Sequence, residues 1–177
     1  MGRFFSLVQI KNNGSREQFL KAFCDVMKKR SLVPCSEKES SVSYILAFSE
    51  SGKWVTLASK EYRDNPKQVK DDAKQTAAEM KTSSFSMDVV DSDWTYIELH
   101  TGADVHDTVM VGRSEFDEEH SPKGRRECWE PILAPGKTWE QISEIWNKNE
   151  VFVEDALYEA ASVLGIEPKY MVSDYED

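Results

Sequence analysis

The densest group of potentially reactive side chains lies in residues 89–112, VVDSDWTYIELHTGADVHDTVMVG. His100 and His106, with Asp104 or Asp107 as a carboxylate, could ligate a transition metal if they flank a hairpin turn. Their spacing matches no zinc-protease or zinc-finger signature. Turns between strands explain the same residues, because Asp, Ser and Gly accept turn conformations. We therefore predict turns and no bound metal or other cofactor, with His100, Asp104 and His106 as the candidate ligands if a metal binds.

The start of this segment also has the alternating oxygen ligands of a calcium loop, in Asp91, Asp93 and Thr95. Such a loop needs glycine at its sixth position and a bidentate glutamate at its twelfth. Tyr96 and Gly102 occupy these two positions. The sequence therefore excludes a calcium loop of this type.

Cys128, in the sequence GRRECWEP, is the second candidate for chemistry. Arg125 and Arg126 could lower the pKa of its thiol, and His120 lies in the same segment as a candidate base. The surrounding residues match no papain-like or caspase-like pattern. No glycine-rich phosphate-binding motif occurs in the chain either. The sequence therefore favours a protein without enzymatic activity.

The charge of the chain is distributed unevenly. Its 177 residues carry a formal net charge of −10, but residues 1–82 have 15 Lys/Arg and 10 Asp/Glu, whereas residues 83–177 have 7 and 22. The C-terminal half would repel nucleic acid phosphates and attract a basic protein. An acidic surface also keeps a protein soluble without any partner, and this alternative stays open.

Length and composition predict a single folded domain over residues 1–177. The chain is 40% hydrophobic and 31% charged, as in folded soluble domains, and no apolar run reaches membrane-spanning length. The N-terminus has no signal-peptide pattern, and the three cysteines form no CxxC motif. We expect a cytoplasmic protein that binds neither membranes nor nucleic acid.

The first half of the chain predicts strands and helices from its hydrophobic periodicity. Residues 3–11 are apolar on both faces and predict a central strand. Ser15 and Gln18 form a capping box that opens a helix, and Asn65 and Pro66 open a second one whose inner face is small. Between these helices, residues 41–49 and 53–59 alternate around a hairpin turn.

The second half predicts three short strands and then two helices. The strands are residues 84–90, 94–100 and 107–112. Residues 113–137 show little periodicity and predict a long loop, which is usually functional or mobile. A capping box at Thr138 and Gln141 opens one helix, and Asn149 is the predicted cap of the last helix, which ends at Gly165.

The predicted fold is α+β, with an antiparallel sheet of about six strands in the order β-α-β-β-α-β-β-β-α-α. The first six elements match the ferredoxin-like (split βαβ) arrangement, in which both helices cover one face of the sheet. The added strands would extend that sheet, and the two C-terminal helices would close an edge or the second face. Such a topology carries no function by itself.

Two functional hypotheses follow from these residues. The first is a cytoplasmic, non-enzymatic interaction domain, for example an immunity-type protein that binds a basic partner through its acidic C-terminal half. In this hypothesis the acidic run of the long loop and a partly exposed tryptophan carry binding, namely Asp117, Glu118, Glu119 and Trp129. The alternative is a small-ligand or metal-binding domain, or a small enzyme, with a site around His100 and His106 or around His120 and Cys128. A homodimer is compatible with both.

Overall fold

The centre of the molecule is one antiparallel sheet of six strands. The computed structural model describes residues 4–35, 42–59, 66–102, 104–112, 122–148 and 152–172. The strand order across the sheet is β2-β3-β1-β4-β5-β6. The strands are β1 Phe5–Lys11, β2 Tyr44–Phe48, β3 Trp54–Ser59, β4 Ser83–Val90, β5 Trp94–Thr101 and β6 Asp104–Gly112. The predicted α+β class and the predicted number of strands are therefore confirmed.

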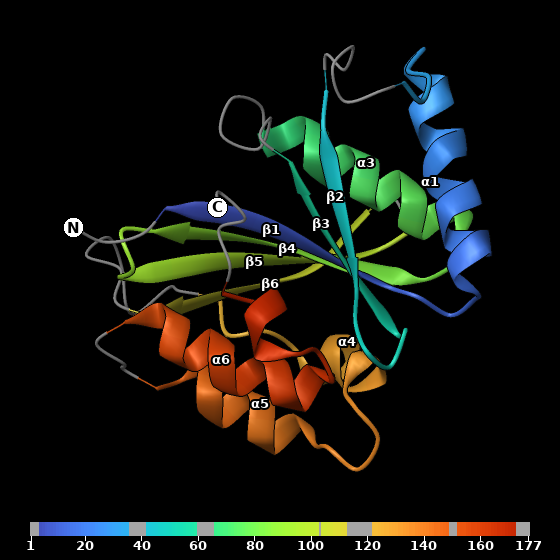
Figure 1. Ribbon diagram of the computed structural model, residues 1–177. Helices are drawn as coiled ribbons and strands as arrows, with labels where there is room; N and C mark the ends of the chain where they lie inside the picture. The colour runs from blue at the N-terminus through green and yellow to red at the C-terminus, as the bar shows by residue number, and fades with distance from the viewer. Residues whose placement is uncertain are drawn as a thin grey trace.

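Helices cover both faces of this sheet (Figure 1). The described residues form five α-helices: α1 Arg16–Lys29, α3 Pro66–Glu79, α4 Arg126–Trp129, α5 Trp139–Trp146 and α6 Val153–Leu164. α1 and α3 pack on one face, and α4, α5 and α6 pack on the other. The C-terminal helices thus close the second face, which was one of the two predicted placements.

The central strand β1 explains why two cores form. Val8 and Ile10 belong to the core under α1 and α3, whereas Phe5 and Leu7 belong to the core under the C-terminal helices. Side chains alternate between the two faces along a strand, so a strand that is apolar on both faces is buried on both. The predicted central position of this strand is confirmed by its pairing with β3 and β4.

Several predicted helix boundaries agree with the structure. The capping boxes at Ser15 and Thr138 are both formed, and Pro66 is the first residue of α3. Gly165 ends α6 in the left-handed conformation, with φ +77°, which glycine adopts without steric cost. The structure gives Phe152 as the N-cap of α6. The predicted caps Asn65 and Asn149 lie outside the described residues.

The prediction of a long loop over residues 113–137 is wrong for its second half. Residues 126–132 form α4 and a 3-10 turn, Glu130–Ile132, and a further 3-10 turn, Pro168–Tyr170, follows α6. The sequence signal is weak because a helix of four residues is too short to show a periodic apolar face. Burial of Cys128, Trp129 and Ile132 against the sheet stabilises this segment instead.

The outer edge of β6 is also partly occupied. The Met110 amide donates to the Pro122 carbonyl at 2.8 Å, and Val109 forms an isolated bridge with Lys123. The chain therefore returns along β6 before it enters α4. Within the described ranges, no helix is long and apolar enough to cross a membrane.

Candidate functional site

Trp129, the predicted partly exposed contact residue, is completely buried. Its exposed fraction is 0%, and its ring lies 4.5 Å from that of Trp146 and 6.0 Å from that of Phe85, measured between centroids. The indole Nε1 donates to Asp107 Oδ2 at 2.9 Å. The prediction that Trp129 is exposed is therefore wrong, because α4 directs this side chain into the core instead of toward a partner.

The same contacts argue against Cys128 as a nucleophile. Its thiol is buried and lies 4.0 Å from the His106 carbonyl oxygen. Burial, reinforced by the Asp107 carboxylate, raises the pKa of Cys128, and the opposing effect of Arg125 is smaller. A thiol with a raised pKa is a poor nucleophile at neutral pH. The candidate base His120 lies outside the described residues.

The three candidate metal ligands lie in different surroundings. His100 is buried on the sheet face that packs against α3, whereas Asp104 and His106 are exposed. The register of β5 and β6 shifts between Leu99 and His100, and this irregularity accompanies the turn. Among the described residues, no group of three or more His, Cys, Asp or Glu side chains could hold a metal ion.

His100 is an unusual buried histidine. Its exposed fraction is 1%, and neither ring nitrogen makes a hydrogen bond of normal geometry, although the Asp104 backbone lies near enough to favour the protonated ring slightly. Burial, aided by Lys74 and Lys70, lowers its pKa to about 4, and Glu98 opposes this effect only in part. The imidazole is therefore neutral at pH 7, and it contributes packing between β5 and α3 instead of charge.

This lowered pKa predicts a pH-dependent stability. The unfolded state takes up a proton near pH 6.5 and the folded state only near pH 4. The contribution of neutral His100 to the free energy of unfolding is fully present above pH 6.5. It is lost as the pH falls toward 4, by up to about 3 kcal/mol. Urea unfolding at several pH values should show a steeper decrease for wild type than for His100→Leu. Parallel curves for the two proteins would contradict this prediction.

The part of the sheet beyond α3 carries a second group of polar and aromatic side chains. In Figure 1 the left ends of the strands extend past α3 on the upper side of the sheet. We call this surface the open sheet face; its residues are partly exposed and face the side of α3: Asp88 and Val90 of β4, Trp94, Tyr96 and Glu98 of β5, and Thr108 and Met110 of β6. Phe4, just before β1, is 57% exposed.

Two carboxylates and one ammonium group lie at the border of the open sheet face. Lys70 Nζ of α3 lies 2.5 Å from Asp88 Oδ2 and 3.1 Å from Glu98 Oε2. Burial alone would lower the pKa of Lys70, but the two carboxylates raise it above its usual value. Ser6 Oγ also donates to Asp88 Oδ1 at 2.6 Å. The cluster carries a net negative charge, because one cation faces two carboxylates.

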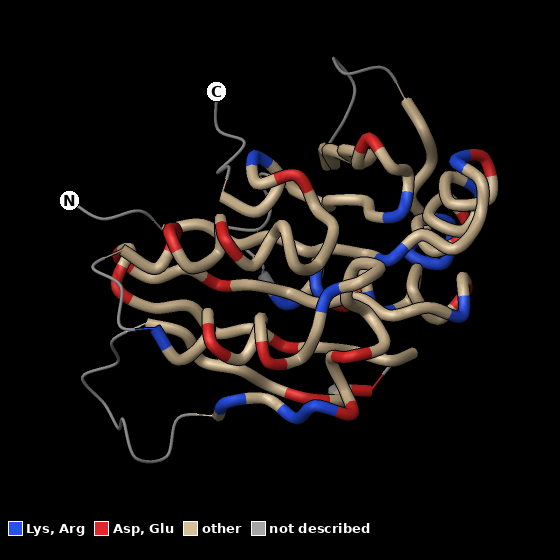
Figure 2. Tube along the Cα trace, turned by 90° about the horizontal axis from the view of Figure 1, so that it is seen from below, with Lys and Arg blue, Asp and Glu red and all other residues tan. Residues whose placement is uncertain are grey.

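The helices α5 and α6 carry a second acidic surface, on the opposite side of the sheet. Their sequences, WEQISEIW and VEDALYEAASVL, contain five Asp/Glu and no Lys or Arg. Figure 2, which views the molecule from below Figure 1, shows the acidic segments along these helices. A shallow groove between them is bordered by Glu144, Glu159 and Tyr158 and also by Lys137 and Lys148, of which Lys148 pairs with Glu159. Tyr158 is 58% exposed.

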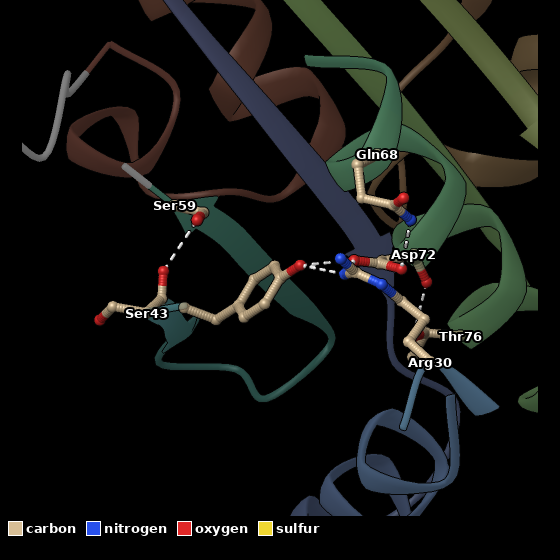
Figure 3. A network of polar contacts seen from close by, with 7 residues as sticks. Arg30, Ser43, Ser59, Gln68, Asp72 and Thr76 are labelled. Atoms are coloured by element: carbon tan, nitrogen blue, oxygen red, sulfur yellow. Dashed lines mark hydrogen bonds and ion pairs between the residues drawn. The ribbon is translucent and has the colours of Figure 1, made fainter. Parts of the chain in front are cut away.

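A third polar network, around Asp72, is structural. The Asp72 carboxylate is buried, and it accepts hydrogen bonds from Arg30 Nη1 and Tyr44 Oη, each at 2.5 Å, and from Gln68 Nε2 at 3.1 Å (Figure 3). Burial and the bond to Asp72 raise the pKa of Tyr44 above its usual value. The phenol therefore stays protonated as a donor, and the network joins α1, β2 and α3.

Comparison of the chain with protein-family models, with curated proteins and with solved structures finds no match.

The open sheet face was not predicted as a surface. Trp94 and Tyr96 lie on the predicted strand 94–100, but the side of the sheet that they face was not predicted. The signal was the alternation of Trp94, Tyr96 and Glu98 with the buried Thr95 and Ile97. Lys70 had no such signal, because its partners Asp88 and Glu98 lie 18 and 28 residues away.

Proposed function

We propose that this protein is a non-enzymatic interaction domain that binds a basic protein through its acidic C-terminal half. The open sheet face supports this proposal most directly, since it combines partly exposed Trp94 and Tyr96 with the carboxylates Asp88 and Glu98. Trp and Tyr are enriched where proteins bind one another, because they bring apolar area together with a polar group. An immunity-type protein that neutralises a cationic toxin is one form that such a function takes.

The acidic helices α5 and α6 support the same proposal through long-range attraction. The five carboxylates of α5 and α6 outnumber the two cations that pair with them, Arg126 with Glu140 and Lys148 with Glu159, and the excess creates a negative potential over this part of the surface. Such a potential increases the association rate of a basic partner more than it changes the lifetime of the complex. These helices would therefore attract the partner even if it docks elsewhere.

The acidic run Asp117, Glu118 and Glu119 keeps its predicted role in this proposal. These residues lie outside the described residues, between Gly112 and Pro122 in the chain. Gly112 is the last residue of β6, and the Pro122 carbonyl accepts a hydrogen bond from Met110 of that strand, so both flanking residues lie at the border of the open sheet face. Trp129 no longer belongs to the proposed contact residues, because it is buried in the core.

Capture of a partner from a lysate of the source cells tests the proposal. Tagged wild-type protein should retain a basic protein at about 50 mM salt and lose most of it at about 500 mM, because screening weakens attraction between exposed charges. Reversing the charge of exposed residues on α5 and α6, with Glu144→Lys, Asp155→Lys and Glu159→Lys, should lower recovery at low salt several-fold.

The matched control reverses three exposed carboxylates of the N-terminal half, with Glu17→Lys, Glu50→Lys and Glu79→Lys. The two triple variants have the same net charge, so only the position of the charges differs between them. The control should retain the partner better than the α5 and α6 variant does. Equal recovery by both variants, or retention that is insensitive to salt, would contradict the proposed function.

The alternative small-ligand or metal site has less support. His100 is buried and His106 is exposed, so the two imidazoles do not share one environment. Cys128 is buried with a raised pKa. His100 and Cys128 are therefore not accessible, and exposed His106 belongs to no group of three or more metal-ligating side chains in the described part of the chain.

We further propose a ferredoxin-like arrangement for the N-terminal part. The strand order β2-β3-β1-β4, with α1 and α3 on one face, supports it. We also propose a cytoplasmic setting, which the free cysteines Cys24, Cys35 and Cys128 support, since disulfides are rare in a reducing compartment.

A further inference from the structure

We propose that the open sheet face binds an arginine side chain of the basic partner, with the guanidinium group paired with Glu98 and stacked on Trp94 or Tyr96. This inference rests on the proposed function and specifies the chemistry that the partner must present. Three features of the face carry it: an accessible carboxylate oxygen, neighbouring aromatic rings, and a net negative charge.

Glu98 offers one carboxylate oxygen to a ligand. Its Oε2 accepts from Lys70 Nζ at 3.1 Å and lies 3.5 Å from Ser86 Oγ. Its Oε1 makes no hydrogen bond among the described residues, and this oxygen is not fully buried. By contrast, both oxygens of Asp88 are engaged, one with Ser6 and one with Lys70. Glu98 Oε1 is thus the acceptor of the cluster that an incoming donor can reach.

Two aromatic side chains share the side of the sheet that carries this acceptor, Tyr96 two residues and Trp94 four residues before Glu98 along β5. Trp94, Tyr96 and Glu98 occupy alternate positions of β5, so their side chains share one face. Tyr96 lies opposite Met110 of β6 and opposite Asp88 of β4. A guanidinium group over Trp or Tyr is attracted by the ring, and this attraction adds to the ion pair with a carboxylate.

The charge of the face selects a cation over other ligands. Lys70 compensates only one of the two carboxylates, so an added positive charge would balance the cluster. A phosphate-bearing ligand would be repelled by Asp88 and Glu98. Arginine suits the site better than lysine, because its planar group stacks on a ring and donates to a carboxylate at the same time.

Titration with a defined peptide tests this inference without the natural partner. The probe is acetyl-Gly-Arg-Gly-Arg-Gly-amide, and its neutral counterpart carries citrulline in place of each arginine. The Trp94 indole N–H resonance, assigned by comparison with Trp94→Phe, should shift with the arginine peptide and stay unchanged with the citrulline peptide. Glu98→Gln should weaken binding about tenfold, since a charge-assisted hydrogen bond is lost.

Two further variants separate a specific site from general attraction. Glu17→Gln removes one exposed carboxylate of α1 and should bind the arginine peptide as wild type does. Trp94→Ala removes a ring without changing charge, and it should also weaken binding several-fold. Equal affinity of wild type, Glu98→Gln and Trp94→Ala would overturn the inference. Salt-dependent capture of a basic partner together with that result would leave the proposed function standing while the arginine site fails.

Discussion

Asp72→Ala is expected to destabilise the protein by about 3 kcal/mol, in the range for a buried ion pair that loses one partner. The Asp72 side chain is 0% exposed, and that of Arg30 is 24% exposed. Removing the carboxylate leaves the Arg30 guanidinium and the Tyr44 hydroxyl without their buried acceptor. The remaining exposure of Arg30 keeps the cost at the lower end of the range. The free energy of unfolding in urea measures this change.

Neighbouring substitutions provide the controls for Asp72. Asp71 pairs with Lys67 at the surface, so Asp71→Ala should change stability by less than about 0.5 kcal/mol. Tyr44→Phe removes one hydrogen bond and should cost about 1 kcal/mol. An Asp72→Ala protein as stable as Asp71→Ala would contradict the structural role of this network.

Trp129→Ala should also be strongly destabilising, by about 3–5 kcal/mol, as for a large aromatic residue removed from a core. The ring packs between Trp146 and Phe85, and its indole nitrogen holds Asp107. Loss of the side chain would leave a cavity between α4 and the sheet. Urea unfolding again measures the effect.

Trp129→Phe separates the cost of the lost buried volume from the cost of the lost hydrogen bond to Asp107. It keeps most of the buried volume but removes the hydrogen bond to Asp107, so it should cost about 1–3 kcal/mol. The sequence prediction of a partly exposed Trp129 implied a small effect for both substitutions. A loss of less than about 1 kcal/mol for Trp129→Ala would therefore contradict the buried position of this side chain.

Elements with a strong local signal could be predicted from the sequence. The capping boxes at Ser15 and Thr138 mark helix starts because their side chains satisfy backbone groups within three residues. The two apolar faces of β1 predicted its central place, since each face must be buried against a different layer. The element order followed from these local patterns up to β6.

The residues that were missed depend on contacts across long separations. Trp129 is buried because Gly124, with φ +79°, lets the chain turn close to Val109 and Trp146. Its burial was missed because a helix of four residues has no periodic apolar pattern. The partnership of Lys70 with Asp88 and Glu98 depends on how α3 crosses the sheet. Side-chain alternation shows which residues share a face, but it does not show which face a helix leaves open.

The most direct test of the central claim is partner capture with a variant of the open sheet face and a variant of the opposite surface. Trp94→Ala with Glu98→Gln removes an aromatic ring and a carboxylate from the open sheet face. Tyr158→Ala with Glu144→Gln removes the same kinds of group from the α5 and α6 groove. We expect the first double variant to lose the basic partner and the second to retain most of it. Retention by the first variant and loss by the second would contradict docking on the open sheet face.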